Sequence, residues 1–367
     1  MHGTSERKTI LAPVAVLLDL EDRCGHETSW IRCGLFFQAK LFPRARARRA
    51  YGGAREAALR RPGGTDAGLA LMALIWGANF TVIKAVLEQL EPLALNALRF
   101  PLAALALGLL LRLRGPLPWP RAEDRWRIVW LGVVGNVLYQ LLFIFGIDWT
   151  LAGNAALLLA TTPVWTLVLS TAVLGERYGA GVWAGVCATL VGMVLVVAGG
   201  PDALDFSSAR VRGDVLMVGA SLVWSIYTVG AQDLTRRYGS LAVTTWTLRV
   251  GAAGLVALGA VPLARRGVAH LDAAAWGGVA YAGVLAIAVA YALWYRGVEH
   301  IGSSRTAVYS NAVPVVALAV AWVWLGERPT PLQVVGAAVI VGGVAWARTG
   351  RARRERAPAA GPGAAAD

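Results

Sequence analysis

The 367-residue sequence is poor in the residues from which disulfides, metal sites and hydrolytic sites are built. It has three cysteines with no Cys-x-x-Cys spacing, and its four histidines are scattered. It also lacks His-Glu-x-x-His, Gly-x-Ser-x-Gly and Asp-rich motifs. These absences argue against a disulfide framework, a metal site or an enzyme. We therefore expect no catalytic residues, no metal and no cofactor.

Charged residues are also scarce, at 16% of the chain, against about a quarter in soluble proteins. Hydrophobic residues make up 57%, and the mean hydropathy is +0.56. The apolar runs reach about 20 residues, which is long enough for a helix to cross a hydrocarbon core of roughly 30 Å. The composition therefore predicts an all-α integral membrane protein embedded in a lipid bilayer.

The net charge of +13 comes largely from arginines outside the apolar runs. They cluster before the first run, in residues 44–61, and after the last, in residues 348–356. Such basic flanks are typical of cytoplasmic segments attracted to anionic lipid, so we expect no nucleic-acid partner. We interpret residues 1–66 as a disordered basic N-terminal extension and 349–367 as a disordered basic C-terminal tail.

Between these tails the hydropathy pattern predicts ten membrane spans. They cover about 67–88, 93–112, 127–147, 153–174, 179–199, 214–233, 241–263, 276–297, 303–325 and 331–348. We expect residues 67–199 and 214–348 to form two repeats of five helices each, joined by a linker at 200–213.

The two halves carry a duplicated segment. Gly146–Arg177 aligns without a gap with Gly297–Arg328 (297 − 146 = 151), and both end in Leu-Gly-Glu-Arg. A duplicated apolar half is typical of transporters built from structural repeats. Because five is an odd number of spans, the second half must enter the membrane from the opposite side, which predicts inverted repeats. Arginines in the loops after the second and sixth spans place both termini in the cytoplasm.

Several short motifs then carry a resemblance to a known family. They are Trp76-Gly77-Ala78-Asn79-Phe80, Leu98-Arg99-Phe100 and the two duplicated segments with Pro163 and Pro314. In order and spacing, the pattern over residues 66–348 resembles the EamA-like family of drug/metabolite transporters. The resemblance implies a ten-helix carrier of the bacterial inner (plasma) membrane that moves small metabolites, often amino acids or related solutes, outward.

Pro163 and Pro314 predict helix breaks at equivalent places in the fourth and ninth spans, because proline has no N–H to bond back to the carbonyl four residues earlier. Paired breaks point to a binding site near the middle of the membrane, with Thr161 and Asn311 beside them. A kink whose free carbonyl is satisfied by a neighbouring helix or water is the alternative.

Polar and aromatic side chains at helical spacing give further substrate-binding candidates. The third span carries Asn136, Tyr139 and Gln140, the eighth carries Tyr291 and Trp294, and Asn79 and Tyr227 occupy equivalent positions in the first and sixth spans. Side chains of this kind are costly against lipid, so they face protein or a water-filled cavity. Interhelical packing and hydrogen bonding are the alternative role.

Arg99 and Arg249 are equivalent arginines about two turns inside the second and seventh spans. One role for such a residue is to extend its charge to the membrane surface. The other is to face inward and bind a substrate carboxylate through two parallel hydrogen bonds.

The acidic residues lie where the ends of helices are predicted. Asp66 and Asp214 suit the starts of the first and sixth spans, and Glu176 and Glu327 suit capping of the Leu-Gly-Glu-Arg turns. Since no Asp or Glu is predicted near the centre of a span, a carboxylate proton relay and an exporter of cationic drugs are disfavoured. Facilitated diffusion or exchange is the simpler mechanism.

We therefore predict a secondary transporter that exports small metabolites such as amino acids or related solutes by alternating access. The alternatives are a membrane-embedded enzyme acting on a lipid-like substrate, or a channel. Oligomeric state does not follow from the sequence.

Overall fold

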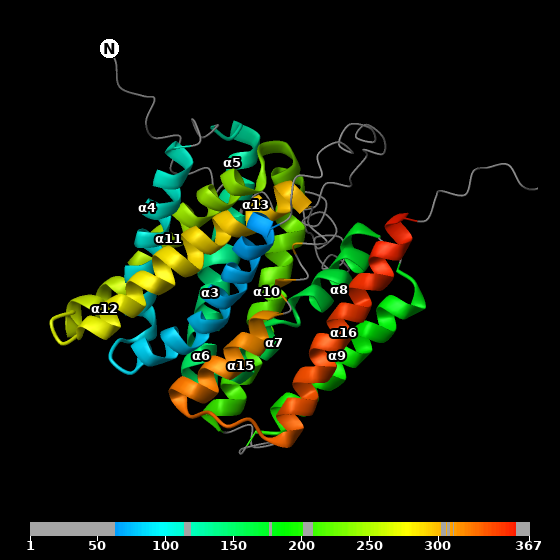
Figure 1. Ribbon diagram of the computed structural model, residues 1–367. Helices are drawn as coiled ribbons and strands as arrows, with labels where there is room; N and C mark the ends of the chain where they lie inside the picture. The colour runs from blue at the N-terminus through cyan, green and yellow to red at the C-terminus, as the bar shows by residue number, and fades with distance from the viewer. Residues whose placement is uncertain are drawn as a thin grey trace, which may run out of the picture. The chain divides into compact units, whose positions relative to one another are not determined.

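The computed structural model describes residues 63–113, 119–175, 178–200, 208–301, 306, 309–310 and 312–356. All regular elements in these ranges are helical, as Figure 1 shows. Most of the N-terminal extension, the end of the C-terminal tail, Glu176 and Asn311 lie outside the described residues. A backbone surrounded by hydrocarbon must bond to itself, so apolar runs of this length form helices.

The first half contains α3 (Gly63–Leu87), α4 (Pro92–Arg112), α5 (Ala122–Gly132), η1 (Val133–Leu138), α6 (Tyr139–Trp149), α7 (Ala152–Leu159), α8 (Thr162–Leu174) and α9 (Ala180–Ala198). The second half contains α10 (Ala209–Tyr238), α11 (Ser240–Arg266), α12 (Ala273–Ala280), η2 (Tyr281–Val289), α13 (Ala290–Ile301), α15 (Ala312–Leu325) and α16 (Pro331–Arg356). The last helix extends eight residues past the predicted end of its span at 348.

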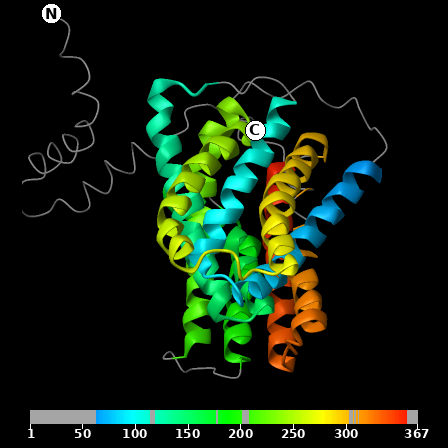
Figure 2. The ribbon, with the colours of Figure 1, turned by 90° about the vertical axis from the view of Figure 1, so that its left-hand side faces the viewer.

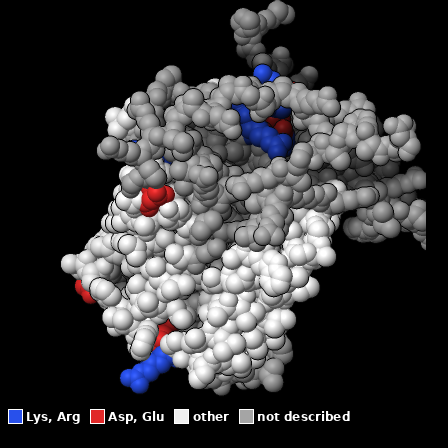
Figure 3. Space-filling model, turned by 45° about the vertical axis from the view of Figure 1, so that its right-hand side comes forward, with Lys and Arg blue, Asp and Glu red and all other residues white. Residues whose placement is uncertain are grey.

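Eight helices of the described chain are long and apolar enough to cross a membrane. Two shorter apolar helices, Ala312–Leu325 and Pro331–Ala347, stand where the ninth and tenth spans were predicted. In Figure 3 the visible Lys and Arg side chains lie near the upper and lower ends, and the surface between them is mostly uncharged. The chain is a membrane protein with several spanning helices.

Helices of the first half pack against helices of the second half. Each of these contacts has an equivalent in which the two halves change roles. α4 packs along α11, and α9 packs along α16 (Figures 1 and 2). α3 contacts α15 as α10 contacts α7 and α8, and α3 contacts α13 as α10 contacts α6. The duplication seen in the sequence is therefore matched in the packing.

The glycine of each Leu-Gly-Glu-Arg motif ends a helix. Gly175 follows α8, Gly326 follows α15, and both have φ of +68°, a left-handed conformation that a side chain disfavours. The duplicated motif thus encodes the same helix stop in both halves.

Both halves also contain a π-helical segment, η1 and η2, which the sequence did not predict. Gly132, the last residue before η1, and Gly283, within η2, are equivalent glycines at which the chain approaches the opposite half (283 − 132 = 151). A Cβ on Gly132 would lie 2.6 Å from Val250 Cβ of α11, and one on Gly283 would lie 2.7 Å from the carbonyl oxygen of Arg99 in α4. The absence of a side chain at Gly283 therefore lets η2 lie directly against the backbone of Arg99.

Candidate functional site

Arg99 is the charged side chain around which the site is built. It is the eighth residue of α4, about 10 Å from the helix start at 1.5 Å per residue, and only 2% of its surface is exposed. Its Nε donates to Asn96 Oδ1 at 2.9 Å, and its Nη2 donates to Gln140 Oε1 at 2.7 Å. The guanidinium therefore does not reach the membrane surface but turns toward the middle of the third span.

Within the described part of the chain, no Asp or Glu forms an ion pair with Arg99. Its guanidinium carbon lies 5.5 Å from the ring centroid of Phe100 and 5.8 Å from that of Phe143. Tyr139 and Tyr291 are near enough to interact with it electrostatically. A buried ion without an opposite charge costs several kcal/mol, and two neutral amides and aromatic faces offset only part of this cost.

Asn96 adds a second polar group without a full set of hydrogen-bond partners beside Arg99. The residue is fully buried, and its Oδ1 is oriented by the bond from Arg99 Nε. Its Nδ2 is buried and has no hydrogen-bond acceptor. A buried donor without a partner is costly, so this corner of the site presents hydrogen-bond donors in excess of acceptors.

Aromatic rings from α3 and α13 form one row beside the site. The ring centroid of Trp76 lies 6.0 Å from that of Tyr291 and 5.8 Å from that of Trp294. Trp76 Nε1 donates to the carbonyl of Ala286 in η2 at 2.8 Å, which fixes the indole. The π-helical segment thus positions the first aromatic row.

A second aromatic row comes from α6 and α10. Tyr139 stacks on Phe143 with centroids 5.7 Å apart and lies 4.8 Å from Trp224, which is 5.1 Å from Tyr227. The Tyr227 hydroxyl lies 3.1 Å from Thr247 Oγ1 in α11. Tyr139, Trp224 and Gln140 remain half-buried, so the second row keeps accessible surface.

Asn79 lies on α3 three residues from Trp76 and one from Phe80, a spacing that places the three on neighbouring parts of one helix face. It is half-buried, and its Oδ1 is buried without a donor. Phe80 contacts Phe143 with centroids 5.8 Å apart. We therefore keep Asn79 as a substrate-binding candidate.

Three other candidates lie elsewhere. Arg249 is exposed and runs beside Gly108 of α4. Asn136 is buried in η1 against Gly251 of α11. Thr161 is buried against Ser221 of α10, with hydroxyl oxygens 3.2 Å apart. Asn136 thus packs against α11, whereas Gln140 bonds Arg99 of α4.

The fourth span is interrupted between α7 and α8, immediately before Pro163. The carbonyl of Leu159, which Pro163 cannot bond, accepts instead from Thr162 Oγ1 at 2.7 Å. Pro314 is buried as the third residue of α15. At Pro163, the local hydroxyl satisfies the break without a ligand.

A second polar cluster joins the halves at the end where α6 meets α7. Lys84 Nζ donates to the carbonyls of Ile147 and Thr150, and Thr150 Oγ1 donates to Asp214. The prediction that Asp214 starts the sixth span is wrong. α10 begins at Ala209, and Ser208 Oγ accepts from Val211 N at 3.2 Å as its cap. Asp214 therefore lies five residues after the helix start, and its side chain is buried.

Glu327 belongs to the same end of the bundle. Its two carboxylate oxygens accept from the backbone N–H groups of Ala152, at 3.0 Å, and Gly153, at 3.2 Å. It therefore caps the start of α7 in the opposite half rather than its own turn. A carboxylate at a helix N-terminus also interacts favourably with the helix dipole.

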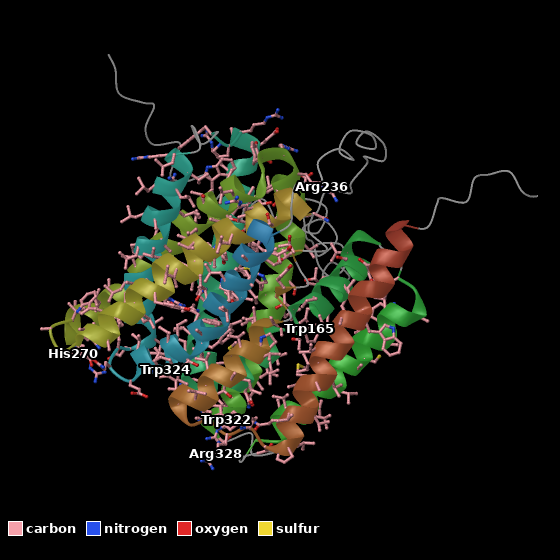
Figure 4. All side chains as sticks on the ribbon, in the orientation of Figure 1. Trp165, Arg236, His270, Trp322, Trp324 and Arg328 are labelled. Atoms are coloured by element: carbon pink, nitrogen blue, oxygen red, sulfur yellow. The ribbon has the colours of Figure 1, made fainter. Side chains whose placement is uncertain are left out.

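The connection between α3 and α4 is tied to the start of α12. His270 (labelled in Figure 4) has its Nε2 2.8 Å from the carbonyl of Gln89. Asp272 accepts from Ala275 N at 2.7 Å and from Gln89 Nε2 at 3.0 Å. These hydrogen bonds lower the pKa of the Asp272 carboxyl below its ordinary value. The exposed connections before α4 and before α12 are thus held together by ordinary capping contacts.

Sequence reasoning missed Asn96 and Lys84 altogether. Asn96 stands three residues before Arg99, so it shares a helix face with that arginine, and this spacing was a usable signal. Lys84 offered none, because a lysine near the end of a span is usually at the membrane surface.

Comparison with known proteins agrees with this architecture. The profile of the EamA-like transporter family matches residues 65–198 and 211–349. A "Probable terminal-alkyne amino-acid exporter" of Streptantibioticus cattleyicolor is 32% identical over 278 residues, covering 75% of this chain and 90% of that protein. A "Probable amino-acid metabolite efflux pump" of Escherichia coli is 28% identical, covering 75% and 91%. A solved crystal structure shares the fold with a TM-score of 0.56 at 21% identity, over 80% of this chain and 98% of that one.

Proposed function

The chain belongs to the EamA-like transporter family, and on that premise we propose that it is a secondary transporter of the bacterial inner membrane. Its substrates are small metabolites such as amino acids or related solutes, and it exports them. The names of the relatives from S. cattleyicolor and E. coli support both the substrate range and the direction.

The observation that carries the proposal is the burial of Arg99. A guanidinium buried inside a membrane span without an opposite charge is destabilising unless an anion pairs with it. A substrate carboxylate does so by accepting two parallel N–H bonds. Arg99, Asn96 and Gln140 then hold the charged end, while Tyr139, Tyr291 and Trp294 contact the remainder.

We propose ten spans arranged as two inverted repeats with both termini in the cytoplasm. The equivalent helix contacts that each half makes with the other support this arrangement. In Figure 1, α8 ends toward the top of the view and α15 toward the bottom, as inversion requires. Arg236 and Arg328 lie toward opposite ends of the bundle in Figure 4, in keeping with loops on opposite sides of the membrane.

Alternating access requires that one end of the bundle opens while the other closes. In the proposed orientation, Lys84, Thr150, Asp214 and Glu327 lie at the end away from the cytoplasm. The bonds from Thr150 to Asp214 and from Ala152 to Glu327 cross between the halves, and Lys84 holds the Thr150 carbonyl from within the first half, so this cluster closes the outer exit. Export then includes a step in which these bonds break and the two bundles rock apart.

Counter-transport in proteoliposomes tests the proposal. Vesicles loaded with an unlabelled amino acid or related metabolite should accumulate the same labelled compound from outside, because the unlabelled compound returns the binding site to the outside and competes with efflux of the label. A channel gives labelled influx without this stimulation. A membrane-embedded enzyme gives no flux, and absence of flux across a panel of amino acids and metabolites would refute the transporter.

A further inference from the structure

We propose that the Arg99 site selects singly charged organic anions, namely carboxylates with an apolar or aromatic body and no ammonium group, over zwitterionic amino acids. This inference rests on the proposed function and specifies the substrate class of the same site. Among the amino acids and related solutes of the proposed function, it assigns this site to the related carboxylates, although the names of the two relatives refer to amino acids and their metabolites.

The site offers donors for a negative charge. Two of the five N–H donors of Arg99 have recorded partners, Asn96 and Gln140. Asn96 Nδ2, on a side chain with no exposed surface, is a further buried donor without an acceptor. Two independent unfilled groups thus lie side by side, and a carboxylate has the oxygen atoms to satisfy both.

The site offers no opposite charge for an ammonium group. On α3, α4, α6, α10 and α11 the acidic residues are Asp66, Asp148, Asp214 and Asp233, and each lies within about two turns of a helix end. Asp148 stands eight residues, or about 12 Å, from Gln140 along α6. Asp66 accepts from Tyr309 at 2.6 Å, Asp214 from Thr150, and Asp233 from Arg127 at 3.2 Å. From Asp66 to Trp76 is ten residues of α3, or about 15 Å. No carboxylate of these helices is placed to meet a charge bound near Arg99.

The α-ammonium of an amino acid is fixed one carbon away from its carboxylate. When the carboxylate binds Arg99, the ammonium lies within a few ångströms of the guanidinium and repels it. Its available partners are uncharged, namely the faces of Trp76, Tyr139 and Tyr291 and the buried Oδ1 of Asn79, which has no donor. Cation–π attraction and one neutral hydrogen bond are weaker than the cost of removing an ammonium from water. A zwitterion therefore binds here less favourably than a carboxylate without an ammonium group.

The two aromatic rows suit the rest of such an anion. Trp76, Tyr291 and Trp294 form one row, and Tyr139, Phe143 and Trp224 the other, with both rows reaching the neighbourhood of Arg99. Aromatic side chains favour flat apolar groups by stacking and by edge contacts. A carboxylate attached to an aromatic or unsaturated chain matches both the charge and the lining.

Phenylpyruvate and phenylalanine test this selection, because at neutral pH they differ only in a ketone oxygen against an ammonium group. Each labelled compound is offered to proteoliposomes preloaded with the same unlabelled compound. We expect phenylpyruvate to have an initial rate per unit concentration at least tenfold above that of phenylalanine. In Arg99→Gln this preference should fall to less than twofold, whereas the exposed Arg249→Gln should retain it.

The outcomes separate the inference from the function it rests on. If phenylalanine is transported as fast as phenylpyruvate or faster, the anion selection is refuted while the carrier stands. Transport of other metabolites, with neither phenyl compound moving, refutes the aromatic carboxylate class alone. No stimulated flux of any metabolite refutes both.

Discussion

Arg99 in α4 donates a 2.7 Å hydrogen bond to Gln140 in α6, and this bond links the second span to the middle of the third. The repeat offset of 151 makes Tyr291 the counterpart of Gln140 (291 − 140 = 151), and Tyr291 also lies near the guanidinium. The two halves therefore present an amide and a phenol to one arginine. The site is asymmetric although the fold is duplicated.

Gln140→Glu should inhibit transport without unfolding the protein. The new carboxylate would stand where the amide oxygen now accepts from Arg99, so it would supply the charge that we assign to the substrate. We expect carboxylate transport to fall at least tenfold, with a thermal unfolding midpoint in detergent equal to or above that of the wild type. Unchanged transport with a lowered midpoint would contradict the assignment.

Arg99→Gln should reduce transport of anionic substrates by about 10- to 100-fold, since hydrogen bonds to charged groups contribute about 1.5–3 kcal/mol each. Arg99→Lys should retain the charge but lose the paired geometry, with an intermediate rate. Initial rates are compared with protein abundance in the same membranes. Arg249→Gln is the matched control because that arginine is exposed, and equal losses in rate and abundance for Arg99→Gln would indicate a purely structural role.

Arg99 and Arg249 differ in burial and in their partners, and the sequence did not predict this difference. Both occupy equivalent places in apolar helices, so hydropathy cannot distinguish them. Their environments differ because Arg99 meets Gln140 and Arg249 meets only the surface beside Gly108. The family, the helical class and the duplicated helix stop at Gly175 and Gly326 followed from local patterns, whereas a side chain's partners depend on tertiary packing.

The π-helical segments were unpredictable for a similar reason. The residues of η1 and η2 are apolar like those of the neighbouring α-helices, so the hydropathy pattern does not distinguish the wider turn. Asn136, within η1, packs against Gly251 of α11, a contact that its spacing from Gln140 did not indicate. Asp214 was misplaced because α10 starts five residues earlier, in a segment whose arginines obscure the apolar pattern.

Gly283→Ala should disturb the site by packing alone. The added Cβ would lie 2.7 Å from the carbonyl oxygen of Arg99, so η2 and α4 must separate. Overpacking of this kind costs about 1–3 kcal/mol, and the shift moves Arg99 relative to Gln140. We expect a lower thermal midpoint and slower transport. Gly277→Ala, at a glycine of α12 with nothing within 4 Å, should change neither, and a neutral Gly283→Ala would refute the close approach.

Glu327→Gln should favour opening of the outer end. The amide keeps one acceptor oxygen but removes the negative charge from the α7 N-terminus, an effect of about 1 kcal/mol. In a variant without native cysteines, Ala155→Cys, buried in α7, should react with a membrane-impermeant maleimide severalfold faster when Glu327→Gln is added. Arg328→Gln, an exposed neighbour, is the control. An unchanged or slower labelling rate would argue against an outer closure at Glu327.

Calorimetric titration of a carboxylate into the purified protein tests the central claim, that Arg99 is the buried partner of the substrate charge. With phenylpyruvate as the probe, we predict saturable binding at about one site per chain in the wild type and in Arg249→Gln, and at least a tenfold weaker affinity in Arg99→Gln. Equal affinity in Arg99→Gln, with the protein still folded, would contradict the account.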